Sequence, residues 1–272
     1  MDFSISLYNV YLFTTDSPLR KFHYIYFTFF LLCLVSFFLY SQTEEKEETK
    51  EYHSREFDFQ KAKRVLKRFY KKVGTDFYCG CPFSEDKEVL GRLKIDFESC
   101  GLASRKDNLR QTWIEWEHIV PAYSFGNSLE CWTKKDCEVN GKPVRGRKCC
   151  RATDPEFNRM EADMHNIVPV PGEINADRGT FSYGEIEGEE RNYGLCDFEI
   201  NFKEQTAEPK PNIRGDIART YFYMEWKYGI PVPENRRKLY ESWDKQDPPD
   251  TFEIRKNEII ERIQKVKNPF ID

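Results

Sequence analysis

The sequence lacks several signatures that would assign a function directly. It contains no internal repeat and no His-Glu-x-x-His run, the spacing that places two zinc-binding histidines on one helix face. Its closely spaced cysteines lack the two-residue gap of a zinc knuckle, because Cys79 and Cys81 are one residue apart and Cys149 and Cys150 are adjacent. A repeat array is therefore not expected, and the common zinc sites are disfavoured.

An excess of positive charge is also absent. The chain has 272 residues and a formal net charge of −4 at pH 7. Residues 41–58 contain seven acidic and three basic side chains, residues 1–40 contain two of each, and the remainder balances at 37 against 37. A neutral domain can still present a basic cleft when its charges are segregated. The net charge therefore neither supports nor excludes a phosphate-bearing partner.

The N-terminal part contains one long apolar run. Residues 22–40 include no Asp, Glu, Lys or Arg and follow Arg20 and Lys21. Nineteen such residues can span a bilayer as a helix. A basic flank followed by an apolar run suits either a cleaved secretion signal or a membrane anchor. No small-x-small cleavage site is evident after the run, and both alternatives stay open. Residues 1–21 then form a tail and residues 41–56 an acidic, solvated linker.

The remaining residues, 57–272, are long enough for one folded domain. Apolar residues recur at helical spacing after Phe57 until Gly74, then within Ile213 to Tyr228, and again from about Asp250 to Lys265. These patterns predict three helices. The middle third has short hydrophobic runs, which indicates irregular loops around a small sheet and helix.

The cysteines suggest an oxidising compartment. One of the nine, Cys33, lies in the apolar segment, and the other eight follow it: Cys79, Cys81, Cys100, Cys131, Cys137, Cys149, Cys150 and Cys196. This even number permits four disulfides, which would stabilise a loop-rich domain. Eight cysteines allow 105 pairings, so the connectivity stays open.

The middle third also contains the candidate catalytic and metal-binding residues. Residues 112–120 alternate like a strand, which places Glu117 and His118 on opposite faces, and Pro121 ends the pattern. A bulge or a strand end at His118 would let both side chains reach one site. Histidine can take a proton from water, while Glu117 and Asn175 offer the oxygen ligands that Mg²⁺ prefers. Arg147 has the planar fork that matches phosphate oxygens.

Longer blocks make a family resemblance clear. The chain resembles the bacterial endonuclease I family of periplasmic or secreted nucleases, from about Phe57 to Phe270. The blocks are Phe77-Tyr-Cys-Gly-Cys81, Phe97-Glu-Ser-Cys-Gly101, Ile114-Glu-Trp-Glu-His-Ile-Val-Pro-Ala122, Met160-Glu-Ala-Asp-Met-His-Asn166, Gly172-Glu-Ile-Asn-Ala-Asp-Arg178 and Arg214-Gly-Asp-Ile-Ala-Arg-Thr-Tyr221.

The resemblance implies a fold and an activity. The expected fold is α+β, a mixed α/β single domain that is stapled by disulfides and contains a ββα-metal core. The expected activity is cleavage of DNA, and of RNA, without sequence preference, giving 5′-phosphate products. One Mg²⁺ ion, replaceable by other divalent cations, would serve an exported enzyme that we expect to be a monomer.

Site residues follow from the matching motifs. By resemblance, His118 would be the general base, Glu117 and Asn175 the magnesium ligands, and Arg147 the residue that steadies the phosphate and leaving group. Glu161 would support these residues without contacting the metal or the substrate itself.

Further residues are assigned to nucleic-acid binding or to a structural role. Lys148 and Arg178 are expected among the cations that hold the nucleic-acid backbone. His165 and Asn166 are expected to be structural, because buried polar groups normally need hydrogen-bond partners.

The chain departs from the family pattern between Trp132 and Arg147. This segment is longer than expected and adds Cys137 and Cys150 to the cysteine pattern. The family's disulfide connectivity is therefore not transferred. Two other classes stay open beside a nuclease: a zinc or peptide hydrolase, and an extracellular binding module whose nuclease site has decayed.

Overall fold

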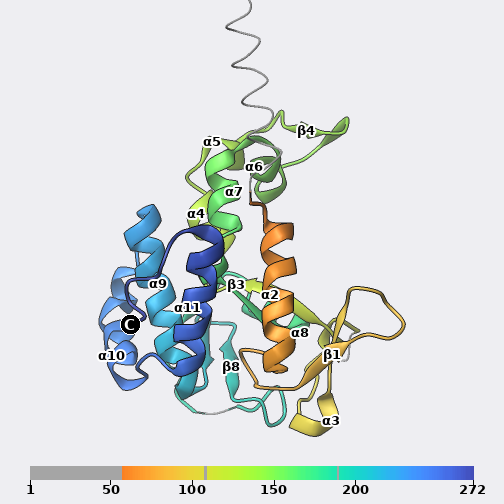
Figure 1. The fold of residues 1–272 in the computed structure, drawn as a ribbon, viewed down its shortest axis with the longest axis vertical. Coiled ribbons are helices and arrows are strands. Elements are labelled where there is room, and N and C mark those ends of the chain that lie inside the picture. Colours follow the sequence, from red (N-terminus) through yellow and green to blue (C-terminus); the bar gives the residue numbers. More distant parts are fainter. Residues whose placement is uncertain (1–56, 107–108, 189) are drawn as a thin grey trace, which may run out of the picture. The chain divides into compact units, whose positions relative to one another are not determined.

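The computed structural model describes residues 57–106, 109–188 and 190–272 (Figure 1). The tail, the apolar segment and the acidic linker expected in residues 1–56 lie outside this part. Within it, none of the helices has the length and apolar character needed to cross a membrane.

A strand pair followed by a helix forms the centre of the domain. Strand β3 (Ile114–His118) pairs antiparallel with β6 (Ile167–Pro171), with His118 opposite Ile167. Helix α8 (Gly172–Arg178) begins directly after β6. All five residues of β6 are buried, so this pair forms part of the core. The arrangement is a ββα unit within an α+β domain, as expected.

The other strands are short. They form a hairpin of β1 (Phe83–Glu85) and β2 (Leu93–Ile95), a hairpin of β4 (Glu138–Val139) and β5 (Lys142–Pro143), and a three-stranded sheet of β7 (Ser182–Tyr183), β9 (Thr206–Pro209) and β8 (Phe198–Asn201). In that sheet β9 is central, parallel to β7 and antiparallel to β8. The prediction of a loop-rich domain with little sheet is confirmed.

The three predicted helices are present. They are α2 (Phe59–Val73), α9 (Arg214–Tyr228) and α11 (Thr251–Gln264). Asp58 caps the start of α2 by accepting the Lys61 amide, and Gly74 ends it with a φ of 80°, a conformation that glycine adopts at little cost. Asp250 caps α11 in the same way as Asp58 caps α2.

A fourth long helix, α10 (Glu234–Gln246), was not predicted from the sequence. It packs on α9 but fully buries only Tyr240 and Trp243, among many charged residues. Its apolar periodicity is therefore too weak to reveal it.

The short helices are α3 (Phe97–Cys100), α4 (Ala122–Gly126), α5 (Glu130–Thr133), α6 (Arg147–Thr153), α7 (Pro155–Glu161) and the 3₁₀ turns η1 (Leu109–Thr112), η2 (Met164–Asn166) and η3 (Pro211–Ile213).

All eight cysteines of the described part form disulfides. The pairs are Cys79–Cys196, Cys81–Cys100, Cys131–Cys150 and Cys137–Cys149. The prediction of four disulfides is confirmed. Two of the bonds fasten the adjacent cysteines of α6, one to α5 and one to the segment before β4.

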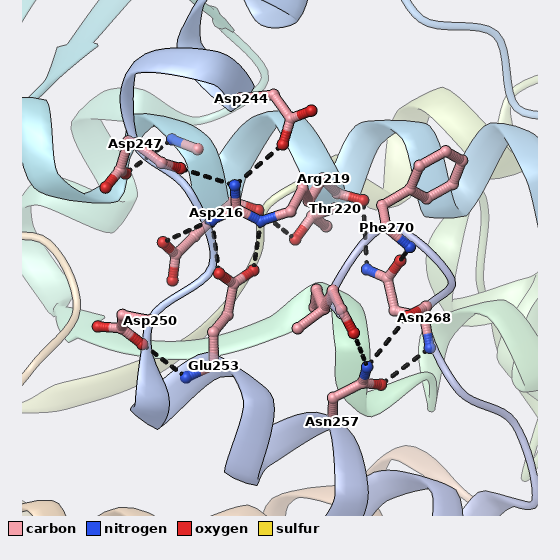
Figure 2. A network of polar contacts seen from close by, with 12 residues as sticks. Asp216, Arg219, Thr220, Asp244, Asp247, Asp250, Glu253, Asn257, Asn268 and Phe270 are labelled. Carbon is pink, nitrogen blue, oxygen red and sulfur yellow. Dashed lines mark hydrogen bonds and ion pairs between the residues drawn. The ribbon is translucent and has the colours of Figure 1, made fainter.

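A buried arginine joins the C-terminal helices (Figure 2). Arg219 on α9 is 0% exposed and donates to both carboxylate oxygens of Glu253 on α11. It also donates to Asp244 Oδ1 at 2.9 Å and to the Asp247 carbonyl at 2.7 Å. Gly215 allows this close approach, because a Cβ there would lie 1.9 Å from the Asp247 carbonyl oxygen.

The last helix also reaches the ββα unit. The side chain of Gln264, at the end of α11, donates to the Ala162 carbonyl at 2.9 Å and accepts from the Met164 amide at 2.9 Å. Ala162 follows the end of α7, and Met164 is the first residue of η2. The end of α11 therefore fixes the segment that follows Glu161.

Candidate active site

The end of β3 presents two neighbouring polar residues that are both buried. Glu117 is 8% exposed and His118 is 3% exposed. The strand ends at His118, as the sequence predicted. Glu117 points to α8, where it accepts from Arg178, whereas His118 contacts α6 and α7. The Glu117 carboxylate also accepts the His118 amide at 3.1 Å, so it folds back along the strand.

Hydrogen bonds define the protonation of His118. Its Nε2 lies 2.8 Å from the Glu161 carbonyl oxygen, an acceptor, so Nε2 carries the hydrogen. The Nδ1 atom is then unprotonated and accepts a hydrogen bond from Arg147 Nη2 at 3.3 Å. Burial, aided by the charge of Arg147, lowers the pKa of His118 to about 4. The imidazole is therefore neutral at neutral pH, with its lone pair on the atom that faces Arg147.

Glu161, the last residue of α7, links this helix to α6. Its side chain is 1% exposed and accepts from Arg147 Nε at 2.5 Å and from Arg151 Nε at 2.8 Å. Burial favours the neutral acid, but the hydrogen bond from Arg151 and the charge of Arg147 outweigh it and lower the pKa of Glu161. The structure thus brings His118, Arg147 and Glu161 together, despite the long segment before Arg147.

Helix α8 supplies polar groups to the same strand. Glu115 and Glu117 lie two residues apart on one face of β3, and Asn175 and Arg178 lie one turn apart on α8. Asn175 Nδ2 donates to Glu115 Oε2 at 2.8 Å, and Arg178 Nη1 donates to Glu117 Oε1 at 2.7 Å. Asn175 Oδ1 accepts no hydrogen bond from the described part of the chain, which leaves an amide oxygen available. The Glu117 carboxylate and this amide are both oxygen donors, the kind of ligand that Mg²⁺ prefers.

One other group of metal-capable side chains lies together in the described residues: Asp76, Cys79 and Cys81. Both sulfur atoms are in disulfides, so neither is a thiolate. The Asp76 carboxylate accepts the Cys79 and Cys81 amides at 2.9 and 2.7 Å. This group is therefore a hydrogen-bonded turn, and its chemistry does not fit zinc.

The two expected backbone-gripping cations have different positions. Lys148 is exposed on α6, where a phosphate can reach it. Arg178 is 0% exposed, and its guanidinium also donates to the His118 and Ile119 carbonyls at 3.0 and 2.7 Å. The expectation of a surface contact is corrected for Arg178, because all of its contacts are internal and no phosphate can reach it in this structure.

The second histidine block, His165 and Asn166, makes no hydrogen bond with the His118 side chain among the described residues and binds backbone and core groups instead. Asn166 accepts the Val120 amide at 2.7 Å and donates to the Val120 carbonyl at 2.9 Å, which fixes the chain just after β3. The ring of His165 lies 4.5 Å from that of Tyr223, and its Nε2 lies 3.3 Å from the Val266 carbonyl. Both residues contact backbone and core, in the manner expected of structural residues.

Sequence reasoning missed three neighbours of the site. Arg151 contacts Glu161, Glu115 contacts Asn175, and the ring of Phe59 lies 5.0 Å from that of His118. Arg151 had a signal, because it follows Arg147 by four residues on a helix. Phe59 had none, because only the tertiary fold brings the start of α2 to this place.

Comparison with known proteins gives consistent matches. The family model described as Endonuclease I matches residues 39–272. An extracellular deoxyribonuclease of Aeromonas hydrophila is 43% identical over 217 residues, 79% of this chain and 87% of its own. A periplasmic deoxyribonuclease of the same species is 41% identical, covering 79% and 85%. Endonuclease-1 of Buchnera aphidicola subsp. Acyrthosiphon pisum (strain APS) is 39% identical, covering 79% and 80%.

Proposed function

Because the chain belongs to the endonuclease I family, we propose that it is a nuclease that hydrolyses DNA phosphodiesters with His118 as general base. One observation carries the proposal: a buried, neutral imidazole is held through Nε2 by the Glu161 carbonyl and presents Nδ1 beside Arg147. This places a proton acceptor next to a phosphate-binding cation.

The proposed reaction is a single displacement at phosphorus. His118 Nδ1 takes a proton from water while the water oxygen bonds to phosphorus. The bond from phosphorus to the 3′ oxygen breaks, and that oxygen leaves with the electron pair and takes a proton from solvent water. The products are a 5′-phosphate on one strand end and a 3′-hydroxyl on the other. Arg147 has an exposed fraction of 39% in its side chain, so its guanidinium is available to the phosphate and to the leaving oxygen.

The residues present fit one divalent cation. We propose that Glu117 and Asn175 hold Mg²⁺ through a carboxylate and an amide oxygen. Such an ion would neutralise the charge that develops on the scissile phosphate. Burial raises the pKa of Glu117 above its ordinary value, and the charge and hydrogen bond of Arg178 oppose this shift, so Arg178 would orient the carboxylate and favour its ionised form.

The proposed substrate range follows from the kind of contact. Lys148 and Arg147 are suited to phosphates and carry no information about bases, so cleavage would have no sequence preference. The same phosphate contacts would also bind RNA. We also propose that the protein is exported, since relatives are named extracellular and periplasmic and four disulfides form in an oxidising compartment. We further propose that it acts as a monomer.

The decisive experiment is plasmid nicking by the purified oxidised protein, with Mg²⁺ or with a chelator. His118→Ala should lower turnover by about 10² to 10⁴, the usual effect of losing a general base. Lys238→Ala is the matched control, because Lys238 is exposed on α10. Wild-type turnover by His118→Ala would overturn the base assignment. A wild-type protein that binds plasmid but never nicks it would instead indicate a binding module.

A further inference from the structure

Three cations gather around a single aromatic ring beside the site. Phe59, the first residue of α2, places its ring centroid 5.0 Å from the ring of His118. Lys63 Nζ lies 4.8 Å from the Phe59 centroid, and the guanidinium carbons of Arg147 and Arg151 lie 5.5 and 5.7 Å from it. Helices α2 and α6 therefore meet at Phe59, and each contributes cations there.

Positive charge is in excess at this meeting point. The carboxylate of Glu161 lies among the cations and pairs with both Arg147 and Arg151. Lys63 makes no ion pair with any residue that the structure describes. Burial and the charges of Arg151 and Arg147 lower the pKa of Lys63, which indicates that its charge is poorly compensated. A bound anion would relieve this repulsion.

The positions of these cations suggest two different tasks. Arg147 donates directly to His118 Nδ1, so it is placed for the phosphate that reacts. Arg151 lies one helical turn further along α6, and Lys63 lies one turn from Phe59 along α2. Neither donates a hydrogen bond to His118 among the described contacts. Arg151 is held by Glu161 but keeps 43% of its side chain exposed, so its guanidinium is fixed in place and still accessible.

We propose that Lys63 and Arg151 form a second phosphate subsite, which binds a backbone phosphate next to the scissile one. This inference rests on the proposed nuclease function and adds the contact that aligns the strand with His118. Lysine offers a compact charge and arginine a planar fork, and both bind phosphate. The Phe59 ring would form the floor between the reacting phosphate and its neighbour.

The test compares two substrates that differ in their number of phosphates. Plasmid DNA can occupy both subsites, whereas bis(p-nitrophenyl) phosphate carries a single phosphodiester. For each variant, kcat/KM is measured on both substrates with Mg²⁺. We expect Lys63→Met to lower the plasmid-to-diester ratio of kcat/KM by about three- to tenfold, mainly through KM. Lys63→Arg, which retains the charge, should restore most of the ratio.

Salt dependence gives a second readout. Losing one phosphate contact should reduce the slope of log kcat/KM against log salt by about 1 for plasmid. Arg151→Lys should retain part of the contribution that this contact makes to the slope, and Arg151→Gln should remove that contribution. Lys238→Met, on α10, should keep the wild-type ratio and slope.

The outcomes separate this subsite from the proposed function. If wild type cleaves plasmid but Lys63→Met and Arg151→Gln match Lys238→Met in ratio and slope, the subsite is wrong and the nuclease stands. If the ratio falls without a change in slope, the residues do not bind a phosphate, and the subsite is again wrong. If wild type cleaves neither substrate, the nuclease proposal itself fails.

Discussion

Arg178 Nη1 donates to Glu117 Oε1 at 2.7 Å, and the guanidinium that makes this bond is 0% exposed. The same side chain binds the carbonyls of His118 and Ile119. One buried cation from α8 therefore fixes both a carboxylate and the backbone at the end of β3.

Removing this cation should destabilise the fold. Arg178→Met would leave the Glu117 carboxylate buried without its partner, which typically costs about 3 to 5 kcal/mol of unfolding free energy. Urea unfolding measures the loss. The double variant Arg178→Met with Glu117→Gln should lose less than the single variant. Arg237→Met, which breaks a half-exposed pair with Glu225 near the surface, should cost less, about 1 kcal/mol. Equal losses in the two single variants would contradict the prediction.

Metal affinity should depend on Glu117 and Asn175. We expect Glu117→Gln and Asn175→Ala each to weaken Mg²⁺ binding by at least about tenfold, because each removes an oxygen ligand or its charge. Calorimetric titration with Mg²⁺ measures the affinity without relying on turnover. Asn235→Ala, at an exposed position on α10, is the control and should bind like wild type. Unchanged affinity in Asn175→Ala would remove that residue from the metal site.

The stability should fall in mild acid because of His165. Burial lowers the pKa of His165 to about 4, whereas an unfolded histidine titrates near its ordinary value of 6.5. Between these values the unfolded chain binds the proton more tightly, so stability is full above pH 6.5 and declines as the pH falls toward 4. The decline amounts to about 3 kcal/mol for this group.

Denaturant unfolding at pH 7, 5.5 and 4.5 tests the assignment. His165→Asn should be less stable at pH 7 but should lose less on acidification than wild type. His118, whose pKa is lowered in the same direction, contributes a parallel decline that both proteins share. Identical pH dependence in the two proteins would exclude His165 as a source.

The disulfides should differ in their importance for turnover. Cys149 lies two residues after Arg147 and pairs with Cys137, closing a separation of 12 residues. The Cys81–Cys100 bond closes a similar separation of 19 residues and lies outside α6. Serine replacement of either pair should cost about 3 kcal/mol of stability. Only loss of the first should also lower turnover per folded molecule, because it removes one of the two bonds that fasten the helix carrying Arg147 and leaves only Cys131–Cys150 to hold it.

Plasmid cleavage normalised to the folded fraction from circular dichroism separates these effects. Equal normalised turnover in the two double-serine variants would show that α6 holds Arg147 without this bond.

The sequence predicted the parts of the fold that have strong local signals. The helix after Asp58 has a cap, an apolar stripe and a terminal Gly74, and the strand end at His118 is marked by Pro121. Helix α10 has no comparable stripe, because it buries only Tyr240 and Trp243 fully and otherwise carries charge. Local pattern decides the first two elements, and tertiary packing decides the third.

The candidate site shows the same division. Glu117, His118 and Asn175 stood out because their motifs are local. The burial of Arg178 and the contact between the rings of Phe59 and His118 depend on which elements pack together, and the local sequence does not determine this. The disulfide pairing was open for the same reason, since many pairings satisfy an even number of cysteines.

The contacts of Gln264 have a consequence for biosynthesis. This side chain binds Ala162 and Met164, 102 and 100 residues earlier in the chain, in the turn that follows Glu161. A nascent chain that has not yet released α11 leaves both backbone groups without these partners. The turn that follows Glu161, whose carbonyl binds His118, therefore cannot complete these contacts until α11 has emerged.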